Sequence, residues 1–248
     1  MRIAFLTTDD PLYLPTLFER VLQVRAENSS VFVVPPLYKG QTTLSAARRY
    51  QQTFGSRATA RLALRTFRAK LERRSIASTC RRHGVPCEAV RDVNDPAFVD
   101  RLASEGVDLV VSVSCPQIFQ PPLIALPQLG CLNVHGAILP SYRGVMPSFW
   151  MLANGEQQAG VSIFYVNGEI DAGELCGQAV FPIRSGESLD AFLRRSKVVA
   201  AELLLDVLRL VEQGQVRRKP LDLSEGSYYS WPDKADVARL KAAGHSVW

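Results

Sequence analysis

Short apolar runs alternate with amphipathic stretches over the first 134 residues of the chain. We interpret five of these runs as strands, at residues 2–8, 30–34, 86–90, 107–114 and 131–134. Helical spacing lies between them at residues 12–25 and at 95–104, which Asn94 or Asp95 can cap, and in a short helix over 121–125. This alternation predicts a Rossmann-like α/β fold with a mostly parallel sheet and helices on both faces.

The pattern changes in the second half of the chain. Residues 160–166 and 177–183 are rich in β-forming residues with glycine-bearing connections, which predicts hairpins. Ser188 can cap a long helix over residues 189–213, and Gly214 can stop it. The second half therefore adds antiparallel strands and one long helix to the predicted sheet.

The loop after the first predicted strand bears on cofactor choice. The strand runs into Thr7-Thr8-Asp9-Asp10-Pro11 and lacks the GxGxxG turn at this position. In dinucleotide-binding folds those glycines let the backbone approach a pyrophosphate. A nicotinamide or flavin dinucleotide is therefore disfavoured.

Length and composition bound the domain count. The chain has 248 residues, of which 47% are hydrophobic, and a mean hydropathy of +0.01, as in an ordinary soluble globular protein. We predict one main domain over residues 1–214 and a C-terminal extension over residues 215–248. The extension has too few residues to form a second independent domain.

Targeting signals and cysteines point to the cytoplasm. The N-terminus lacks a signal-peptide pattern, and no stretch approaches the ~18 consecutive apolar residues of a spanning helix. The five cysteines are odd in number, scattered and without a CxxC pair. We expect a cytoplasmic protein with reduced thiols, no transmembrane segment and no bound metal.

Positive charge is concentrated in one segment. Residues 39–82 hold twelve Lys or Arg against one acid, Glu72, whereas the remainder is net acidic, so nucleic-acid binding by the whole surface is not indicated. A helical wheel places on one face Ala60, Ala63, Leu64, Phe67 and Leu71, flanked by Arg57, Arg61, Arg65 and Arg68. The simpler interpretation is a helix packed on the domain by its apolar face, with solvated arginines at the rim. The alternative is phosphate contact, on a substrate or on an anionic membrane surface.

Candidate chemistry follows the last strand of the alternating half. Asn133 and His135 are two residues apart, so their side chains share one face near the carboxyl end of that strand, where α/β sheets bind ligands. Turn residues follow, and Asp171 lies in a later loop. An Asn, a His and an Asp can divide acyl transfer among oxyanion donor, general base and the group that orients or charges the base.

The residues around this cluster form an ordered run of motifs: Asn133-Val-His135-Gly-Ala-Ile-Leu139-Pro140-Ser-Tyr-Arg143-Gly144, Pro147, Trp150, Gly155-Glu156, Gly160-Val161-Ser162 and Ile170-Asp171-Ala172-Gly173. The run resembles the core of the folate-dependent N-formyltransferases, which include phosphoribosylglycinamide, methionyl-tRNA and amino-sugar formyltransferases. The resemblance is dense over residues 107–183. It implies a formyltransferase catalytic domain over residues 1–214, with a basic helical insertion at about 39–82.

The resemblance also implies an activity and roles for residues. The activity is transfer of a formyl group from 10-formyltetrahydrofolate, a co-substrate, to a primary amine, without a metal. Asn133 would bind the formyl oxygen as it becomes an oxyanion, His135 would move the proton, and Asp171 would hold or charge His135. Residues expected to line the pterin pocket are Val85, Pro86, Val90, Leu139, Ile170 and Gly173. Residues expected to contact a substrate phosphate are Arg143, Arg61 and Arg65.

The acceptor remains open at this stage. Ala137 replaces a serine that the family often carries, and the sequence after residue 214 leaves no room for the barrel with which methionyl-tRNA formyltransferase engages tRNA. Residues 147–150 and 228–232 look closest to short amino-sugar formyltransferases, so we expect a nucleotide- or lipid-linked amino sugar. The alternatives are a formyltetrahydrofolate hydrolase, a methionyl-tRNA formyltransferase, and a catalytically silent folate or nucleotide-sugar binding module. Peripheral membrane contact and a homodimer stay open as well.

Overall fold

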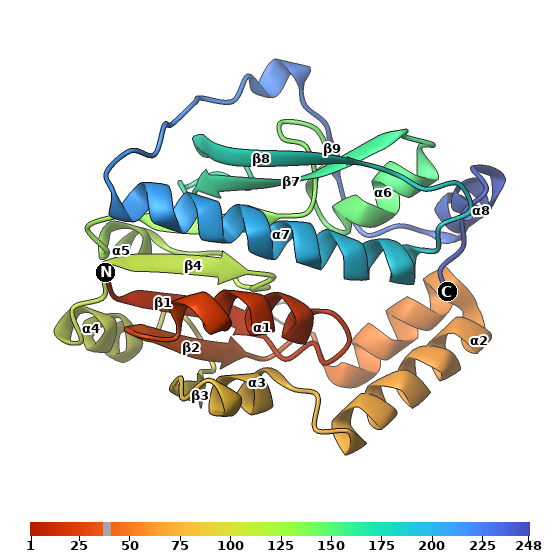
Figure 1. The fold of residues 1–248 in the computed structure, drawn as a ribbon. Helices are drawn as coiled ribbons and strands as arrows, with labels where there is room; N and C mark the ends of the chain where they lie inside the picture. The colour runs from red at the N-terminus through yellow and green to blue at the C-terminus, as the bar shows by residue number, and fades with distance from the viewer. Residues whose placement is uncertain (37–40) are drawn as a thin grey trace.

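A seven-stranded sheet forms the centre of the computed structural model, which describes residues 1–36 and 41–248 (Figure 1). Its strands, in the spatial order β3-β2-β1-β4-β5-β7-β8, are Cys87–Ala89, Ser29–Val34, Ile3–Thr8, Leu109–Val113, Cys131–His135, Gln158–Tyr165 and Leu175–Pro182. The first five are parallel, and β7 and β8 are antiparallel to their neighbours. The predicted mostly parallel sheet is confirmed.

Helices cover both faces of this sheet. One apolar cluster packs under α1 (Leu14–Arg25), α3 (Ile76–Arg82), α6 (Pro147–Ala153), α7 (Leu189–Glu212) and α8 (Lys234–Ala242). The other packs under α4 (Pro96–Ser104) and α5 (Pro121–Ala125). Because both faces are covered, β1 and β4 are almost wholly buried and mostly apolar, as the central strands of a parallel sheet are.

The predicted ends of two helices are confirmed. The Ser188 hydroxyl accepts a hydrogen bond from Ala191 N at 3.2 Å and caps α7, and Gly214 follows the helix with a φ of 65°. Asp95 caps α4 by accepting from Ala97 N at 2.8 Å. These local signals fix where α4 begins and where α7 begins and ends.

The basic insertion forms α2 (Thr43–Leu71), which is kinked at Gly55, where φ is 85°. The predicted insertion begins at residue 39, and its first two residues lie outside the described part of the chain. The first arm of α2 packs on the C-terminal extension: Trp231 Nε1 donates to the Thr53 hydroxyl at 2.9 Å, and Phe54 contacts the ring of Trp231. The insertion and the extension therefore form one packed unit, seen in Figure 1 where α2 (orange) meets α8 and the C-terminus.

The expectation that the second arm of α2 packs by its apolar face is wrong. Leu64, Phe67 and Leu71 are 68%, 61% and 69% exposed, whereas Leu62 is half-buried and Ala69 is buried. The periodicity was correctly helical, but it does not say which face of a helix meets the domain. The face that meets the domain is the one that carries Arg65, which pairs with Asp190 at the start of α7.

The C-terminal extension contributes short elements rather than a layer of its own. It contains the turn η1 (Leu223–Glu225), the strand β9 (Tyr228–Tyr229) and α8. β9 pairs in parallel with β6 (Arg143–Gly144), and the last residues bridge to the start of α7 through Ser188 and Ser246. None of the helices in the described part of the chain is both long and apolar enough to cross a membrane.

Candidate active site

Asn133 and His135 lie at the carboxyl end of β5, between β4 and β7. Cys131 belongs to the cluster under α4 and α5, whereas Leu132 and Val134 belong to the opposite cluster. Alternation along the strand therefore places Asn133 and His135 on the same side as Cys131, as the sequence predicts. Among the described residues no partner is found for the half-buried Asn133 side chain, so its amide is free to donate to a ligand.

The protonation of His135 follows from its surroundings. Its Nε2 lies 2.8 Å from the carbonyl oxygen of Tyr142. A carbonyl can only accept, so Nε2 carries the proton and donates it, and in the neutral ring Nδ1 holds the free lone pair. The ring is 6% exposed, so its orientation is fixed by packing as well as by this bond. Nδ1 is therefore the atom at which His135 can accept a proton.

Asp171 faces that atom. Its Oδ2 lies 3.7 Å from Nδ1 of His135 and accepts a hydrogen bond from Gly144 N at 2.8 Å. The 3.7 Å separation is too long for a hydrogen bond with the neutral ring, but it favours an ion pair once the ring is protonated. Asp171 has a φ of 50°, and Gly173 two residues on passes so close to the carbonyl of Tyr165 that a side chain there would collide with it. The positive φ at Asp171 and the close approach at Gly173 thus hold the Asp171 carboxylate next to His135.

Ser162 holds the loop that follows His135. Its buried hydroxyl accepts from Leu139 N at 3.0 Å and from the Gln178 side-chain amide at 2.9 Å, and donates to Ala137 O at 2.7 Å. These three bonds join the loop to β7 and β8. Ser162 belongs to a motif of the sequence resemblance, but its own role was not predicted, because a lone serine on an apolar strand carries no signal for a loop 25 residues away.

Replacing Ser162 by alanine is expected to lower the free energy of unfolding by about 1–3 kcal/mol. The substitution leaves Leu139 N, Ala137 O and the Gln178 amide without their common partner in a buried setting. Urea unfolding of the two proteins measures the difference. Ser104→Ala is the matched control, because its exposed hydroxyl bonds one carbonyl and its loss is expected to change stability by less than about 0.5 kcal/mol. Equal effects of both substitutions would contradict the role given to Ser162.

The C-terminal extension supports the same loop from the other side. Tyr142 N donates to the Ser227 hydroxyl at 2.9 Å, and Val145 N donates to Tyr229 O at 2.8 Å. The Tyr229 ring is stacked between Tyr142, at 5.2 Å, and Trp150, at 4.7 Å. Tyr142 supplies the carbonyl that orients His135, so residues of the extension hold the loop that fixes the His135 ring.

A lysine and an acid lie next to this edge of the sheet and were not predicted. The pairing of Val113 with Val134 brings Ser114, the next residue, level with His135. Lys197 on α7 donates to the Ser114 hydroxyl at 3.2 Å, and burial lowers the pKa of Lys197. Burial raises the pKa of Asp10, partly offset by bonds from the backbone of Leu12 and by Lys197.

The residues expected to line a pterin pocket divide into two groups. Leu139, Ile170 and Gly173 belong to the two loops that surround His135 and Asp171. Val85 and Pro86 do not reach the site. They precede β3, the edge strand farthest from β7 and β8 in the parallel part of the sheet, and so lie at the opposite end from His135.

Val90 lies at the correct end of β3, though β2, β1 and β4 separate that strand from β5. The chain after it, however, is linked to the segment that follows β4: the Gln117 side chain donates to Arg91 O at 2.8 Å and accepts from Val93 N at 2.8 Å. This second segment, residues 114–119, is the one that β-sheet pairing places beside His135. The strand preceding it was predicted, but its adjacency to β5 depends on strand order, which the sequence pattern does not reveal.

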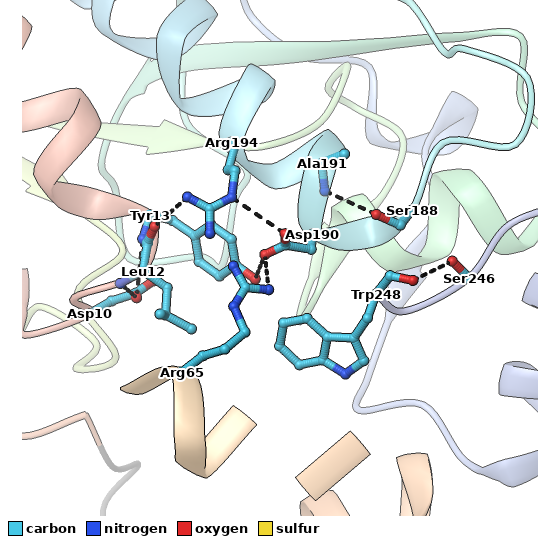
Figure 2. A network of polar contacts seen from close by, with 10 residues as sticks. All are labelled: Asp10, Leu12, Tyr13, Arg65, Ser188, Asp190, Ala191, Arg194, Ser246 and Trp248. Carbon is cyan, nitrogen blue, oxygen red and sulfur yellow. Dashed lines mark hydrogen bonds and ion pairs between the residues drawn. The ribbon is translucent and has the colours of Figure 1, made fainter. Parts of the chain in front are cut away.

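The three predicted phosphate contacts have different surroundings. Arg65 pairs with Asp190 at 2.8 Å and lies over the Trp248 ring at 4.8 Å (Figure 2). Arg61 lies over the same ring at 5.7 Å. Burial raises the pKa of Asp190, but bonds from Arg65 and Tyr13 outweigh it and lower the net pKa, so the Arg65 pair is a fixed structural contact. Arg143 differs from both, because its buried Nε has no hydrogen-bond partner in the described part of the chain.

Within residues 1–36 and 41–248, no group of three or more His, Cys, Asp or Glu side chains is placed to hold a metal ion.

Comparison with known proteins identifies the family. The model of the formyl transferase family matches residues 1–208. Methionyl-tRNA formyltransferase of Syntrophus aciditrophicus (strain SB) is 37% identical over 144 residues, which cover 58% of this chain and 46% of that protein. The enzyme of Geotalea uraniireducens (strain Rf4) is 34% identical over 177 residues, covering 67% and 56%. This chain belongs to the formyl transferase family, and it spans about half the length of the curated relatives it matches.

Solved structures confirm the predicted fold. A sugar N-formyltransferase from Shewanella sp. FDAARGOS_354 aligns with a TM-score of 0.63 at 19% identity, covering 98% of this chain and 87% of that one. Glycinamide ribonucleotide transformylase 1 from Symbiobacterium toebii aligns with a TM-score of 0.61 at 20% identity, covering 90% and 94%. At these identities the likeness establishes the Rossmann-like formyltransferase fold.

Proposed function

We propose that this chain transfers a formyl group from 10-formyltetrahydrofolate to a primary amine. The observation that carries the proposal is the state of His135: Nε2 is committed as a donor to Tyr142 O, and Nδ1 carries the lone pair and faces a carboxylate. A free amide, Asn133, stands on the same side of the same strand. Base, charge partner and oxyanion donor therefore converge at one edge of the sheet.

The chain's residues divide the reaction among them. When bound, 10-formyltetrahydrofolate supplies the formyl carbon as the electrophile. Asn133 donates a hydrogen bond to the formyl oxygen, which gains negative charge as the amine attacks and the new C–N bond forms. His135 accepts the amine proton at Nδ1 and returns it to the folate nitrogen as the old C–N bond breaks. Asp171 stabilises the imidazolium between these two transfers, at the 3.7 Å distance seen in the resting site.

Two segments flank the reacting groups and are proposed to hold the folate. Residues 114–119 leave β4 beside His135 and are fixed to the next loop by Gln117. Residues 166–174 carry Asp171 and are fixed by bonds of Val166 N to Cys131 O and of Tyr165 N to Glu174 O. Both segments combine backbone and polar side-chain groups, which suits a heterocycle with many donors and acceptors.

An amino sugar carrying a phosphate is the acceptor we propose. The support is Arg143, whose Nε is buried without a partner among the described residues and which precedes the glycine that binds Asp171. A guanidinium in this state suits a phosphate. The two motifs shared with short amino-sugar enzymes also pack on each other, through the stacked rings of Trp150 and Tyr229. Identity with methionyl-tRNA formyltransferases favours charged initiator tRNA as the second candidate acceptor.

The test is tetrahydrofolate release from 10-formyltetrahydrofolate, without acceptor and with a panel of amines. The panel holds nucleotide-linked and lipid-linked amino sugars, glycinamide ribonucleotide and charged initiator tRNA. Release that depends on a phosphate-bearing amino sugar is the expected result. Release only with the tRNA would replace the proposed acceptor, and release that needs no amine would make the protein a hydrolase.

Replacing Asn133 by alanine is expected to lower kcat about 10²–10³-fold with little change in melting temperature. The amide is the one donor proposed for the charged formyl oxygen, and losing one such donor in other enzymes has a cost of this size. Steady-state kinetics with both substrates saturating measures it. Asn133→Asp keeps the shape but removes the donor, so it is expected to be at least as inactive. Full activity in either variant would contradict the role of Asn133.

A further inference from the structure

The second arm of α2 turns large apolar side chains toward solvent. Leu64, Phe67 and Leu71 are spaced at i, i+3 and i+7, so they form one stripe along the helix. Each is more than 60% exposed, and the smaller Ala60 on the same stripe is exposed too. Single exposed leucines are common, but an aligned stripe of three large side chains on one helix marks a binding surface.

The opposite side of the arm is firmly held, so the stripe cannot be buried by a small roll of the helix. Arg65 reaches Asp190 at the start of α7 and lies over the ring of Trp248 (Figure 2). Asp190 is in turn bound by the Tyr13 hydroxyl at 2.8 Å and by Arg194. Rolling the arm to bury Leu64 would pull Arg65 out of this network and leave Asp190 without its shortest ion pair.

Positive side chains border the stripe. Arg57, Arg61 and Arg68 are exposed and lie at i−7, i−3 and i+4 from Leu64, and Lys70 is exposed on its other side. Glu72 is the one acidic residue between residues 41 and 82, and it forms only an exposed ion pair with Arg68. Exposed pairs of this kind contribute little and exchange partners readily. The surface is therefore an apolar stripe inside a basic border.

We propose that this face docks on an anionic lipid membrane, with the stripe entering the headgroup boundary and the arginines contacting lipid phosphates. A basic helix with leucine and phenylalanine side chains lies in the interface plane in this manner, and both contributions add. The proposal does not depend on the reaction proposed above, because it is argued from the exposure and charge of α2 alone and uses neither Asn133, His135 nor Asp171.

The charge pattern favours lipid over the other occupants of an apolar face. A second copy that packed this same face symmetrically against the first would bring two basic borders together, and residues 41–82 offer only Glu72 to offset them. A nucleic acid would satisfy the arginines, but it would leave Leu64, Phe67 and Leu71 in water. An anionic bilayer can bind the arginines through its phosphates and the apolar side chains through its headgroup boundary.

The test is co-sedimentation of the full chain with vesicles of phosphatidylcholine alone and of phosphatidylcholine with phosphatidylglycerol. Binding is expected only to the anionic vesicles, and it is expected to weaken as NaCl rises from about 0.05 to about 0.5 M. Leu64→Gln, Phe67→Gln and Leu71→Gln are each expected to weaken it about ten-fold. Replacing Arg57, Arg61 and Arg68 together by Gln is expected to weaken it about 100-fold, since each arginine near such a surface contributes about five-fold.

Two control variants match the exposure and charge of the tested residues elsewhere on the surface. Ile118→Gln removes a side chain 63% exposed, and Arg217→Gln removes an exposed arginine. Both are expected to bind vesicles like the wild type, and circular dichroism checks that every variant is folded. No binding to anionic vesicles at low salt, or equal loss in the control variants, would overturn the proposal. So would a dimer in analytical ultracentrifugation that Phe67→Gln dissociates, or RNA binding that competes with vesicles and is unaffected by Leu64→Gln.

Discussion

Replacing His135 by alanine is expected to lower the rate of formyl transfer about 10³-fold at saturating substrates. Nδ1 is the atom to which the structure leaves the lone pair, and a positioned general acid–base contributes about 10²–10⁴-fold. Removing the ring also leaves Asp171 with no imidazolium to stabilise. Initial rates of tetrahydrofolate release measure the loss, and thermal melting separates it from unfolding.

The other histidines provide the controls for this substitution. His83 binds Glu19 at the end of α3, so His83→Ala is expected to keep full activity. His245 is buried and bonds Glu187 O through Nδ1, so His245→Ala is expected to lower the melting temperature rather than the rate per folded molecule. A similar loss of rate in His83→Ala and His135→Ala would contradict the assignment.

Gly144→Ala is expected to have the second large effect, on stability and activity together. Gly144 has a φ of 93°, and a Cβ there would overlap the carbonyl oxygen of Tyr229. The positive φ is expected to lower the free energy of unfolding by about 1–2 kcal/mol, and the overlap is expected to lower it by about 1–3 kcal/mol more. To relieve the overlap β6 must separate from β9, which also moves Gly144 N away from Asp171. Urea unfolding and the transfer rate measure the two effects.

Gly155→Ala is the matched control for this prediction. Gly155 has a φ of 71°, but open space surrounds the position of its missing Cβ. The Gly155→Ala variant is expected to lose only the free energy of unfolding that the positive φ costs, about 1–2 kcal/mol. Its rate of formyl transfer is expected to stay that of the wild type. Equal effects of Gly144→Ala and Gly155→Ala on stability and rate would show that the contact between β6 and β9 does not affect the reaction.

The sequence predicts the sheet and part of the site because both depend on local pattern. Strand alternation follows from which residues are buried, and the caps at Ser188 and Asp95 involve atoms only two or three residues apart. The pairing of Asn133 with His135 on one side of β5 follows from the period of a strand alone. These features need no knowledge of how the elements are arranged.

What the sequence could not predict depends on distant contacts. The inward face of α2 is chosen by Arg65 and its partner Asp190, which lie 125 positions apart in the chain and meet only after α7 has packed. The place of Val85 and Pro86 depends on strand order, which puts them at the amino end of the edge strand β3, away from His135. Ser162 and Ser227 act through hydrogen bonds to loops that are distant in sequence, and such bonds leave no periodic pattern in the sequence.

We propose that the chain transfers a formyl group to an amine and that His135 moves the proton in this reaction. The most direct test follows an isotopically labelled formyl carbon of 10-formyltetrahydrofolate in the presence of the acceptor found by the panel. If His135 moves the proton in formyl transfer, the label appears as an N-formyl amide in equal amount to the tetrahydrofolate released, and His135→Ala loses both products together. Label recovered as formate, or amide formation undiminished in His135→Ala, would contradict it.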